Sequence, residues 1–279
     1  MAINTPERTT EWLKHFGYLD TMHPDRYQHD GAVATMQRVY GLVEDSDAGP
    51  VTRRAMGLFR CARSDKRMLQ TGALRIDDKH CRWKKSVLTY AIGGRFSLGG
   101  SRNLSLAVLR EGFRIYSVIT GLKFVEVVVW GQGDIRIGRG RGSRLSFDGP
   151  GNVLAWANLP CSDVDEPLMA MFDDQEPWNL KTTGPGIIML AVWLHELGHL
   201  LGLDHSDDPA DLMAPYYNPR IILPQIGDKR RLAHAYDLTA PVIAEPVAGL
   251  PFGAYDIDGT MVLREDGGMA LNLRSVKAV

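Results

Sequence analysis

The chain lacks any long apolar run: the longest near-continuous one spans residues 187–194, far short of the ~20 residues that a helix needs to cross a bilayer. Residues 1–6 lack the basic start and apolar stretch of a signal peptide. The sequence leaves open whether a signal was trimmed or export does not use one. An excess of charge of one sign is also missing, since the net charge is −1. We therefore predict no membrane span and no nucleic-acid partner. The alternating glycine and arginine of residues 138–142 is too short for an RNA-binding box and predicts a solvated loop.

Cysteine is scarce, with only Cys61, Cys81 and Cys161 in 279 residues. Three cysteines are too few for a disulfide scaffold, and their odd number leaves at least one thiol unpaired within the chain. Cys81 and Cys161 could pair in an oxidising compartment, but nothing in the sequence places them near each other. The remaining composition, 44% hydrophobic and 23% charged, is typical of a soluble globular protein.

The patterning of the chain divides it into four segments. Residues 1–58 hold three stretches with helical spacing, at 7–16, 31–40 and 50–58. Residues 59–82 are polar and are predicted to form an exposed linker. Residues 83–237 predict strands at 87–92, 124–130 and 134–138 and helices at 104–120, 186–201 and 225–236, an order that favours an α/β or α+β domain.

The fourth segment, residues 238–279, begins with an extended stretch marked by Pro241, Pro246 and Pro251. Residues 261–265 and 269–274 then flank Asp266-Gly267-Gly268, which predicts a small hairpin. The sequence assigns no function to this extension.

The strongest signal is the stretch His-Glu-Leu-Gly-His-Leu-Leu-Gly-Leu-Asp-His at residues 195–205. On a helix, His195 and His199 lie on one face a turn apart, where both imidazoles can reach one zinc ion. Gly202 permits the sharp turn that returns His205 as a third ligand. Three ligands leave a fourth position open, as in a catalytic zinc site. With a downstream Met213, this spacing is the metzincin signature.

Glu196 is predicted to be the catalytic residue. It lies beside the two helical histidines, close enough to contact a zinc-bound water without being a ligand. Zinc lowers the pKa of such a water toward ~7 and polarises a carbonyl. Glu196 would accept the proton and deliver it to the leaving amine, as general base and then general acid. A bare His-Glu-x-x-His could be accidental, but the added Gly202, His205 and Met213 make surface histidines a poor explanation.

Residues 12–237 resemble the matrixin (matrix metalloproteinase) family, which implies an α+β metzincin domain with a twisted, mostly parallel sheet, long helices and zinc in a cleft. Ser206, directly after His205, is similar to the matrixin pattern. The resemblance places Val192, Pro215 and Tyr217 at the pocket for the side chain after the scissile bond. It places Val153, Leu154 and Ala155 on the edge strand that pairs with substrate backbone. The alternative for the pocket residues is plain packing.

The N-terminal segment resembles the family's propeptide, a three-helix module similar to peptidoglycan-binding domains. Residues 34–42, followed by Pro50, Thr52 and Met56, carry this resemblance. Residues 59–65 resemble its cysteine-switch motif, although only Arg60, Cys61 and Asp65 keep their spacing. The resemblance implies that Cys61 occupies the fourth zinc position in a latent form, with Arg60 and Arg63 favouring a thiolate. An ordinary free cysteine is the alternative.

Matrixins also carry a structural zinc, and here the chain departs from the family. The matching positions are Arg141, Ser143, Trp156 and Met171, none of which is an ordinary zinc ligand. We therefore predict one zinc per chain. A second calcium site of the family is expected to be lost, because only Asp134 of its pattern remains.

One calcium site is better kept. The loop at residues 147–153 resembles the family's calcium loop. The resemblance assigns Asp148, Asp173 and Glu176 as carboxylate ligands, together with the backbone carbonyls of Gly149, Gly151 and Val153. Such an oxygen set suits a hard cation, and a solvated acidic turn is the alternative.

The resulting expectation is a secreted, monomeric zinc endopeptidase that is made as a latent zymogen and acts on protein or peptide substrates. The alternative is a cell-wall or glycan-binding protein with an accessory hydrolase domain, for which a matrix or cell-wall polymer would be the partner. The zinc ligands alone also allow hydrolysis of non-peptide amides.

Overall fold

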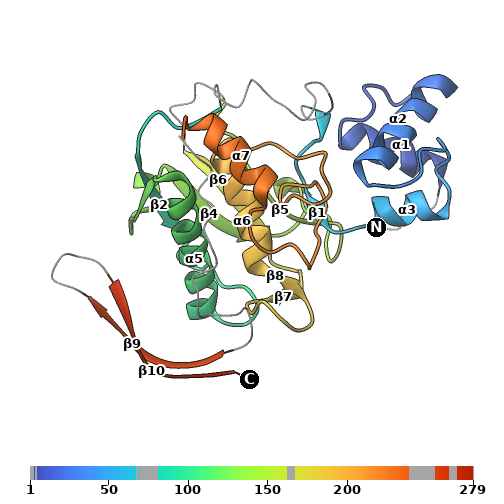
Figure 1. Cartoon of the computed structure of the whole chain (residues 1–279). Coiled ribbons are helices and arrows are strands. Elements are labelled where there is room, and N and C mark those ends of the chain that lie inside the picture. The colour runs from blue at the N-terminus through green and yellow to red at the C-terminus, as the bar shows by residue number, and fades with distance from the viewer. Residues whose placement is uncertain are drawn as a thin grey trace.

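The computed structural model describes residues 3, 5–66, 69, 81–161 and 167–238, and the backbone of 255–263 and 269–278. The rest of the predicted linker, the three prolines at 241, 246 and 251, and the predicted turn at 266–268 lie outside the described residues. Figure 1 shows a helical N-terminal module beside a larger domain of sheet and helices.

The N-terminal module consists of α1 (Pro6–His15), α2 (Arg26–Val39) and α3 (Pro50–Met56). Thr5 caps α1 through its side chain, and Pro6 occupies the first turn. Helix α2 begins earlier than predicted because Asp25 and Gln28 form a reciprocal capping box, which extends the helix ahead of its apolar stripe. The three helices pack around a core that includes Leu13, Val33 and Met36.

The larger domain is built on a six-stranded sheet with the order β1-β5-β6-β4-β2-β3. Its strands are β1 (Arg60–Cys61), β2 (Val87–Ile92), β3 (Lys123–Glu126), β4 (Ile135–Gly140), β5 (Val153–Ala157) and β6 (Leu168–Asp173). All neighbours run parallel except β5 and β6, which are antiparallel. The expected mostly parallel sheet is confirmed, and its first strand comes from the predicted linker.

Two predicted loop and strand boundaries are wrong. The strand predicted at 124–130 ends at Glu126 and is followed by a 3-10 turn, η2 (Trp130–Gln132). Residues 138–140, predicted to be a solvated loop, belong to β4, and a second 3-10 turn, η3 (Ser143–Leu145), follows. Arg139 and Arg141 both pair with Asp174, at 2.6 and 2.9 Å, so their charges are used within the fold.

Three helices complete the domain: α5 (Arg102–Thr120), α6 (Met189–Leu200) and α7 (Ile226–Ala235). Helix α6 begins later than predicted because residues 187–188 form strand β8 (Ile187–Ile188) with β7 (Trp178–Asn179). Hydrogen bonds from Tyr116 Oη to the Leu194 carbonyl (2.9 Å) and from Trp193 Nε1 to the Leu109 carbonyl (2.9 Å) join α5 to α6. Helix α6 is thereby fixed inside the main apolar core.

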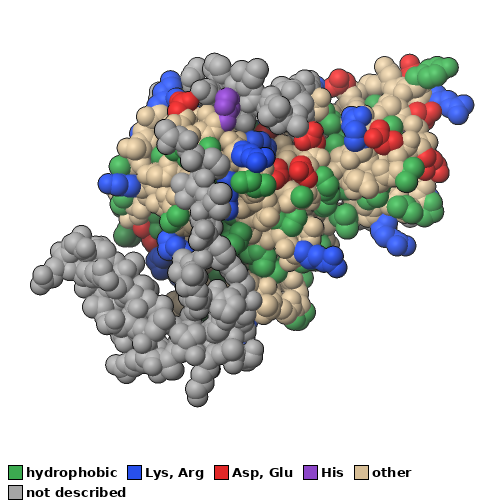
Figure 2. All heavy atoms as spheres, viewed as in Figure 1, with side chains coloured by type: hydrophobic (Ala, Val, Ile, Leu, Met, Phe, Trp, Pro, Cys, Tyr) green, Lys and Arg blue, Asp and Glu red, His purple; other side chains and the backbone are tan. Residues whose placement is uncertain are grey.

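Cys81 and Cys161 form a disulfide, a pairing that the sequence left open. At the C-terminal end, β9 (Tyr255–Leu263) and β10 (Met269–Ala278) form an antiparallel hairpin, which confirms the predicted pair of strands and extends both. None of the described helices is long and apolar enough to cross a membrane. On the face seen in Figure 2, Lys and Arg side chains lie scattered among Asp and Glu.

Candidate metal centre

Helix α6 carries His195, Glu196 and His199 to one buried centre. The preceding turns of α6 are apolar and buried except for the partly buried Leu190, so the helix is anchored before the chain reaches the histidines. The two imidazole rings lie 4.8 Å apart between centroids, as the four-residue spacing predicts.

The chain turns after α6 at Gly202, whose φ is +103°. A side chain there would be strained, and its Cβ would also collide with the carbonyl oxygen of Cys81. The turn returns His205, whose ring lies 5.4 and 4.9 Å from those of His195 and His199. The predicted convergence of the three histidines is confirmed.

The orientation of each ring follows from the partner of its Nδ1 atom. His195 Nδ1 lies 2.9 Å from the Leu212 carbonyl and His199 Nδ1 lies 2.7 Å from the Leu203 carbonyl. A carbonyl only accepts hydrogen bonds, so each Nδ1 carries the proton and each Nε2 offers its lone pair to the centre. His205 Nδ1 lies 2.7 Å from Asp65 Oδ1. The Nε2 atoms of His195 and His205 are buried without a hydrogen-bond partner.

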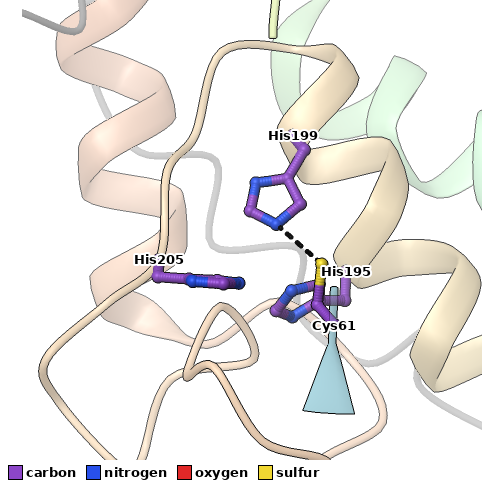
Figure 3. Close-up of side chains that lie close together, drawn as sticks. All are labelled: Cys61, His195, His199 and His205. Carbon is purple, nitrogen blue, oxygen red and sulfur yellow. Dashed lines mark hydrogen bonds between the residues drawn. The ribbon is translucent and has the colours of Figure 1, made fainter. Parts of the chain in front are cut away.

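Cys61 supplies the fourth group, from strand β1 (Figure 3). Its Sγ lies 3.6 Å from His199 Nε2, and the four ligand atoms all lie within 4.8 Å of one another. Among the described residues this is the one group in which three or more ligand atoms of His, Cys, Asp or Glu come this close together, so the three carboxylates assigned to calcium do not form such a group. Three imidazoles and one thiol are a donor set that suits tetrahedral zinc, and the unpartnered Nε2 atoms fit such an ion.

One expectation about the switch segment is wrong: residues 59–65 are not an exposed linker, since Arg60, Cys61 and Asp65 are all buried. Burial, followed by the Glu196 carboxylate, raises the pKa of Cys61 well above its usual value and outweighs the Arg63 backbone N–H and Arg60, which lower that pKa as expected. A bound cation is therefore what would make Cys61 a thiolate.

Burial sets the protonation of the remaining groups. It lowers the pKa of His195 to about 3 and that of His199 well below its usual value. It also lowers the pKa of His205, against the opposing effect of Asp65. Neutral imidazoles are the form that binds a metal. Burial raises the pKa of Glu196 to about 8, and Cys61 Sγ lies 3.7 Å from its Oε2.

The turn around Met213 packs against helix α6 beside the histidines. Met213 is fully buried and its sulfur lies so close to Gly198 of α6 that a Cβ there would come within 2.5 Å of it. The Asp228 carboxylate of α7 accepts hydrogen bonds from the backbone N–H groups of Leu212 (2.9 Å) and Met213 (3.2 Å). Asp228, which the sequence analysis missed, therefore fixes the carbonyl that orients His195.

A small cavity of about 30 Å³ opens beside His195 and Glu196. Four residues assigned to substrate line it, namely Val192, Leu154, Pro215 and Tyr217, together with Arg60 and Cys61. Ala155 does not line the cavity; it lies opposite Cys61 in the β1–β5 pair.

Residues 59–62 of the switch segment lie beside this cavity and pair with β5 as an added strand. Arg60 N–H donates to the Asn152 carbonyl (2.7 Å) and Ala62 N–H to the Ala155 carbonyl (2.9 Å). On the other side, Tyr217 N–H donates to the Phe59 carbonyl at 2.7 Å. Backbone pairing on both sides therefore holds residues 59–62 as an extended strand.

Arg60 joins this strand to the helical module. Its guanidinium lies 3.5 Å from the Phe16 ring centroid and donates to Tyr40 Oη at 2.9 Å and Asp65 Oδ1 at 2.8 Å. The Tyr40 ring in turn stacks on Tyr216 of the larger domain, with centroids 4.6 Å apart. The position of Cys61 is therefore linked to the packing of the whole module.

The residues assigned to calcium lie at the loop between η3 and β5 and at the end of β6. Asp148 accepts from Val153 N–H at 3.3 Å, and Glu176 Oε1 accepts from Gly151 N–H at 2.6 Å. Gly149 and Gly151 take the left-handed backbone conformations that shape the loop. Asp173 Oδ2 and Glu176 Oε2 are buried without a hydrogen-bond partner. Burial, and the charges of Asp173 and Asp148, raise the pKa of Glu176 to about 7.

The positions matched to a structural zinc hold other interactions. Met171 is buried and Trp156 Nε1 donates to the Leu145 carbonyl at 2.7 Å, while Arg141 pairs with Asp174. Ser143 begins η3. Asp134, matched to the second calcium site, accepts from Thr89 N–H at 2.8 Å and from Lys85 Nζ at 2.5 Å.

Comparison with known proteins agrees with this geometry. Residues 82–237 match the family model described as Matrixin. The chain is 33% identical over 232 residues to matrix metalloproteinase-C of Caenorhabditis elegans, covering 76% of this chain and 38% of that protein. It is 32% identical over 228 residues to mouse matrix metalloproteinase-25, covering 74% and 36%. It is 37% identical over 159 residues to rat stromelysin-3, covering 56% and 31%. The chain thus spans about a third of the length of these relatives, and it belongs to the matrixin family.

Proposed function

We propose that this chain is a zinc-dependent endopeptidase held in a latent form by its own residues 1–65, from here on called the N-terminal segment. The observation that carries this proposal is the buried group of Cys61, His195, His199 and His205, with Glu196 against it. Zinc bound there would acidify a water molecule and polarise a peptide carbonyl. Protein or peptide substrates are the partners, and the chain is proposed to act as a monomer.

Glu196 is the proposed general base and general acid. Its Oε2 faces the place of the Cys61 sulfur, so a water molecule that enters when Cys61 leaves would contact this carboxylate. Its buried setting keeps its pKa near neutrality, where a carboxyl group can both accept and return a proton.

Substrate is proposed to bind where residues 59–62 now lie, as an extended strand between β5 and residues 215–217. Leu154 and Ala155 would position its backbone, and Val192, Pro215 and Tyr217 would contact its side chain in the cavity. Met213 would support the metal-binding residues by packing against Gly198 of α6. Segments 1–58, 59–82, 83–237 and 238–279 would then be propeptide, switch and activation linker, catalytic domain and extension.

Calcium is proposed at the loop of residues 147–153. Two buried carboxylate oxygens without hydrogen-bond partners, on Asp173 and Glu176, together with the raised pKa of Glu176, support a cation site beside Asp148. The carbonyls of Gly149, Gly151 and Val153 would complete an oxygen set of the kind calcium prefers. One zinc per chain is proposed, because Arg141, Ser143, Trp156 and Met171 do not offer a second set of zinc ligands.

An extracellular location is proposed from the Cys81–Cys161 disulfide, since disulfides persist in oxidising compartments. The competing hypothesis, a cell-wall or glycan-binding protein, gives no reason for a buried thiol directed at three histidines.

The test measures zinc content and cleavage of a peptide library by the intact chain and by chain cut between residues 66 and 80, ahead of the Cys81–Cys161 disulfide. We expect zinc in both forms and cleavage only by the processed form. Glu196→Ala should keep its zinc and lose turnover, while Glu111→Ala, at an exposed glutamate of α5, should match the wild type. Full activity of the intact chain would refute latency, and turnover by Glu196→Ala would refute the assigned chemistry.

A further inference from the structure

We propose that Asp65 of the N-terminal segment is a positioning residue for His205, so that the latent chain holds its zinc more tightly than the processed domain. This inference rests on the proposed function, because it requires zinc at the group formed by Cys61 and the three histidines.

The three histidines differ in where their supporting partners come from. His195 and His199 are oriented by the carbonyls of Leu212 and Leu203, which belong to the catalytic domain and remain after processing. His205 is oriented by the carboxylate of Asp65, at 2.7 Å. One of the three supports is therefore removed together with the N-terminal segment.

A carboxylate is also a different kind of support from a carbonyl. Hydrogen bonding to a carboxylate fixes the tautomer and the ring of a ligating histidine and raises its basicity. Asp65 and His205 are both fully buried, so their hydrogen bond is not weakened by water. The carboxylate is held ready by Arg60, whose guanidinium donates to the same Oδ1 atom at 2.8 Å.

Processing removes this support in one step. Asp65 lies before residues 66–80, so a cut there leaves it on a fragment that the Cys81–Cys161 disulfide does not hold to the rest of the chain. His205 Nδ1 would then exchange its carboxylate partner for water. The release of the N-terminal segment would therefore weaken two of the four metal contacts, one by loss of Cys61 and one through His205.

The first test compares zinc release from intact wild-type chain, Asp65→Asn and Asp20→Asn. Asp65→Asn keeps an oxygen that can accept from His205 but removes the charge, and Asp20 is a largely exposed carboxylate of the same segment. Loss of zinc to an excess of chelator should be roughly 10- to 100-fold faster for intact Asp65→Asn and unchanged for Asp20→Asn. After processing, all three proteins should release zinc at one rate, because they then share one sequence.

Cobalt(II) substitution separates a positioning effect from general opening of the switch. In intact Asp65→Asn we expect shifted ligand-field bands with the Cys61 thiolate-to-cobalt band retained. Loss of the thiolate band in step with faster metal release would overturn the proposal, since the effect would then act through Cys61. Equal release rates with the band retained would overturn it as well.

A further measurement uses wild-type protein alone, so it tests the proposal even if Asp65→Asn fails to fold. In zinc-loaded chain labelled with ¹⁵N-histidine, the Nδ1–H signal of His205 should be present before processing and lost afterwards, while those of His195 and His199 persist. Persistence of all three signals would contradict the inference alone. Absence of stoichiometric zinc from the intact wild type would instead refute the proposed function.

Discussion

Removal of the Cys81–Cys161 disulfide should destabilise the catalytic domain strongly. We consider the double variant Cys81→Ala/Cys161→Ala. The bridge closes a loop across a sequence separation of 80 residues, and loop-closure entropy for that length corresponds to a stabilisation of roughly 4.5 kcal/mol at 25 °C. Since this value is an ideal one, we expect the free energy of unfolding to fall by about 4 kcal/mol, or Tm by roughly 8–16 °C.

The native contacts around Cys81 should survive the substitution. Trp83 Nε1 donates to the Leu200 carbonyl at 2.7 Å, and Tyr236 Oη donates to the Leu201 carbonyl at 2.9 Å. The first bond keeps Trp83 against the end of α6, and the second holds the end of α7 there, in the folded state. The loss should therefore come mainly from the greater freedom of the unfolded chain.

The assay is urea and thermal unfolding of zinc-loaded intact chain, with and without a thiol reductant. Reductant should lower the stability of the wild type to that of the double variant and leave the variant unchanged. A variant within about 1 kcal/mol of a wild type whose disulfide is verified by mass would refute this reasoning.

Three further predictions concern latency, pH and the metal-binding turn. Arg60→Met leaves the Asp65 carboxylate buried without its cation, a change that costs about 3–5 kcal/mol. Release of the N-terminal segment would expose the carboxylate to water and remove this cost, so peptide cleavage by the intact chain should rise by about 100-fold or more. The control Arg26→Met, at an exposed ion pair, should leave cleavage unchanged. Burial raises the pKa of Glu176 from 4.5 to about 7, so in calcium-free protein the stability that its protonated carboxyl group contributes is fully present below about pH 4.5 and is lost as the pH rises through 7. The difference in unfolding free energy between wild type and Glu176→Gln should follow that window without calcium, whereas saturating calcium at neutral pH should stabilise the wild type more than the variant. Gly202 has φ +103° and lies against the Cys81 backbone, so Gly202→Ala should lower the free energy of unfolding by roughly 1–3 kcal/mol from backbone strain alone. The variant should also release zinc faster, and an unchanged release rate would contradict the account of this turn.

Local patterns predicted the three histidines of the metal site well because these residues are close in sequence. The spacing of His195 and His199 is a property of one helix, and Gly202 is needed for the turn to His205 wherever the helix lies. The strand at 87–92 was likewise predicted correctly, since its apolar run is bounded by polar residues and glycine. The start of α2 was missed because Asp25 and Gln28 cap the helix without extending its apolar stripe.

Contacts between distant segments could not be read from such patterns. The hydrogen bond between Asp65 and His205 joins residues 140 apart, and the disulfide joins residues 80 apart. Arg60 and Cys61 lie in a polar stretch that predicts an exposed linker, yet both are buried because β5 and residues 216–217 offer them backbone partners on two sides. That environment exists only after the sheet has formed.

The most direct test of the account is zinc X-ray absorption spectroscopy of the intact and the processed chain. The account predicts one zinc per intact chain with three nitrogen neighbours at ~2.0–2.1 Å and one sulfur neighbour at ~2.3 Å. Processing should remove the sulfur and leave the three nitrogens with a lighter fourth neighbour. An intact chain whose zinc shows no sulfur neighbour would contradict the assignment of Cys61, and a sulfur that remains after processing would contradict its removal with the N-terminal segment.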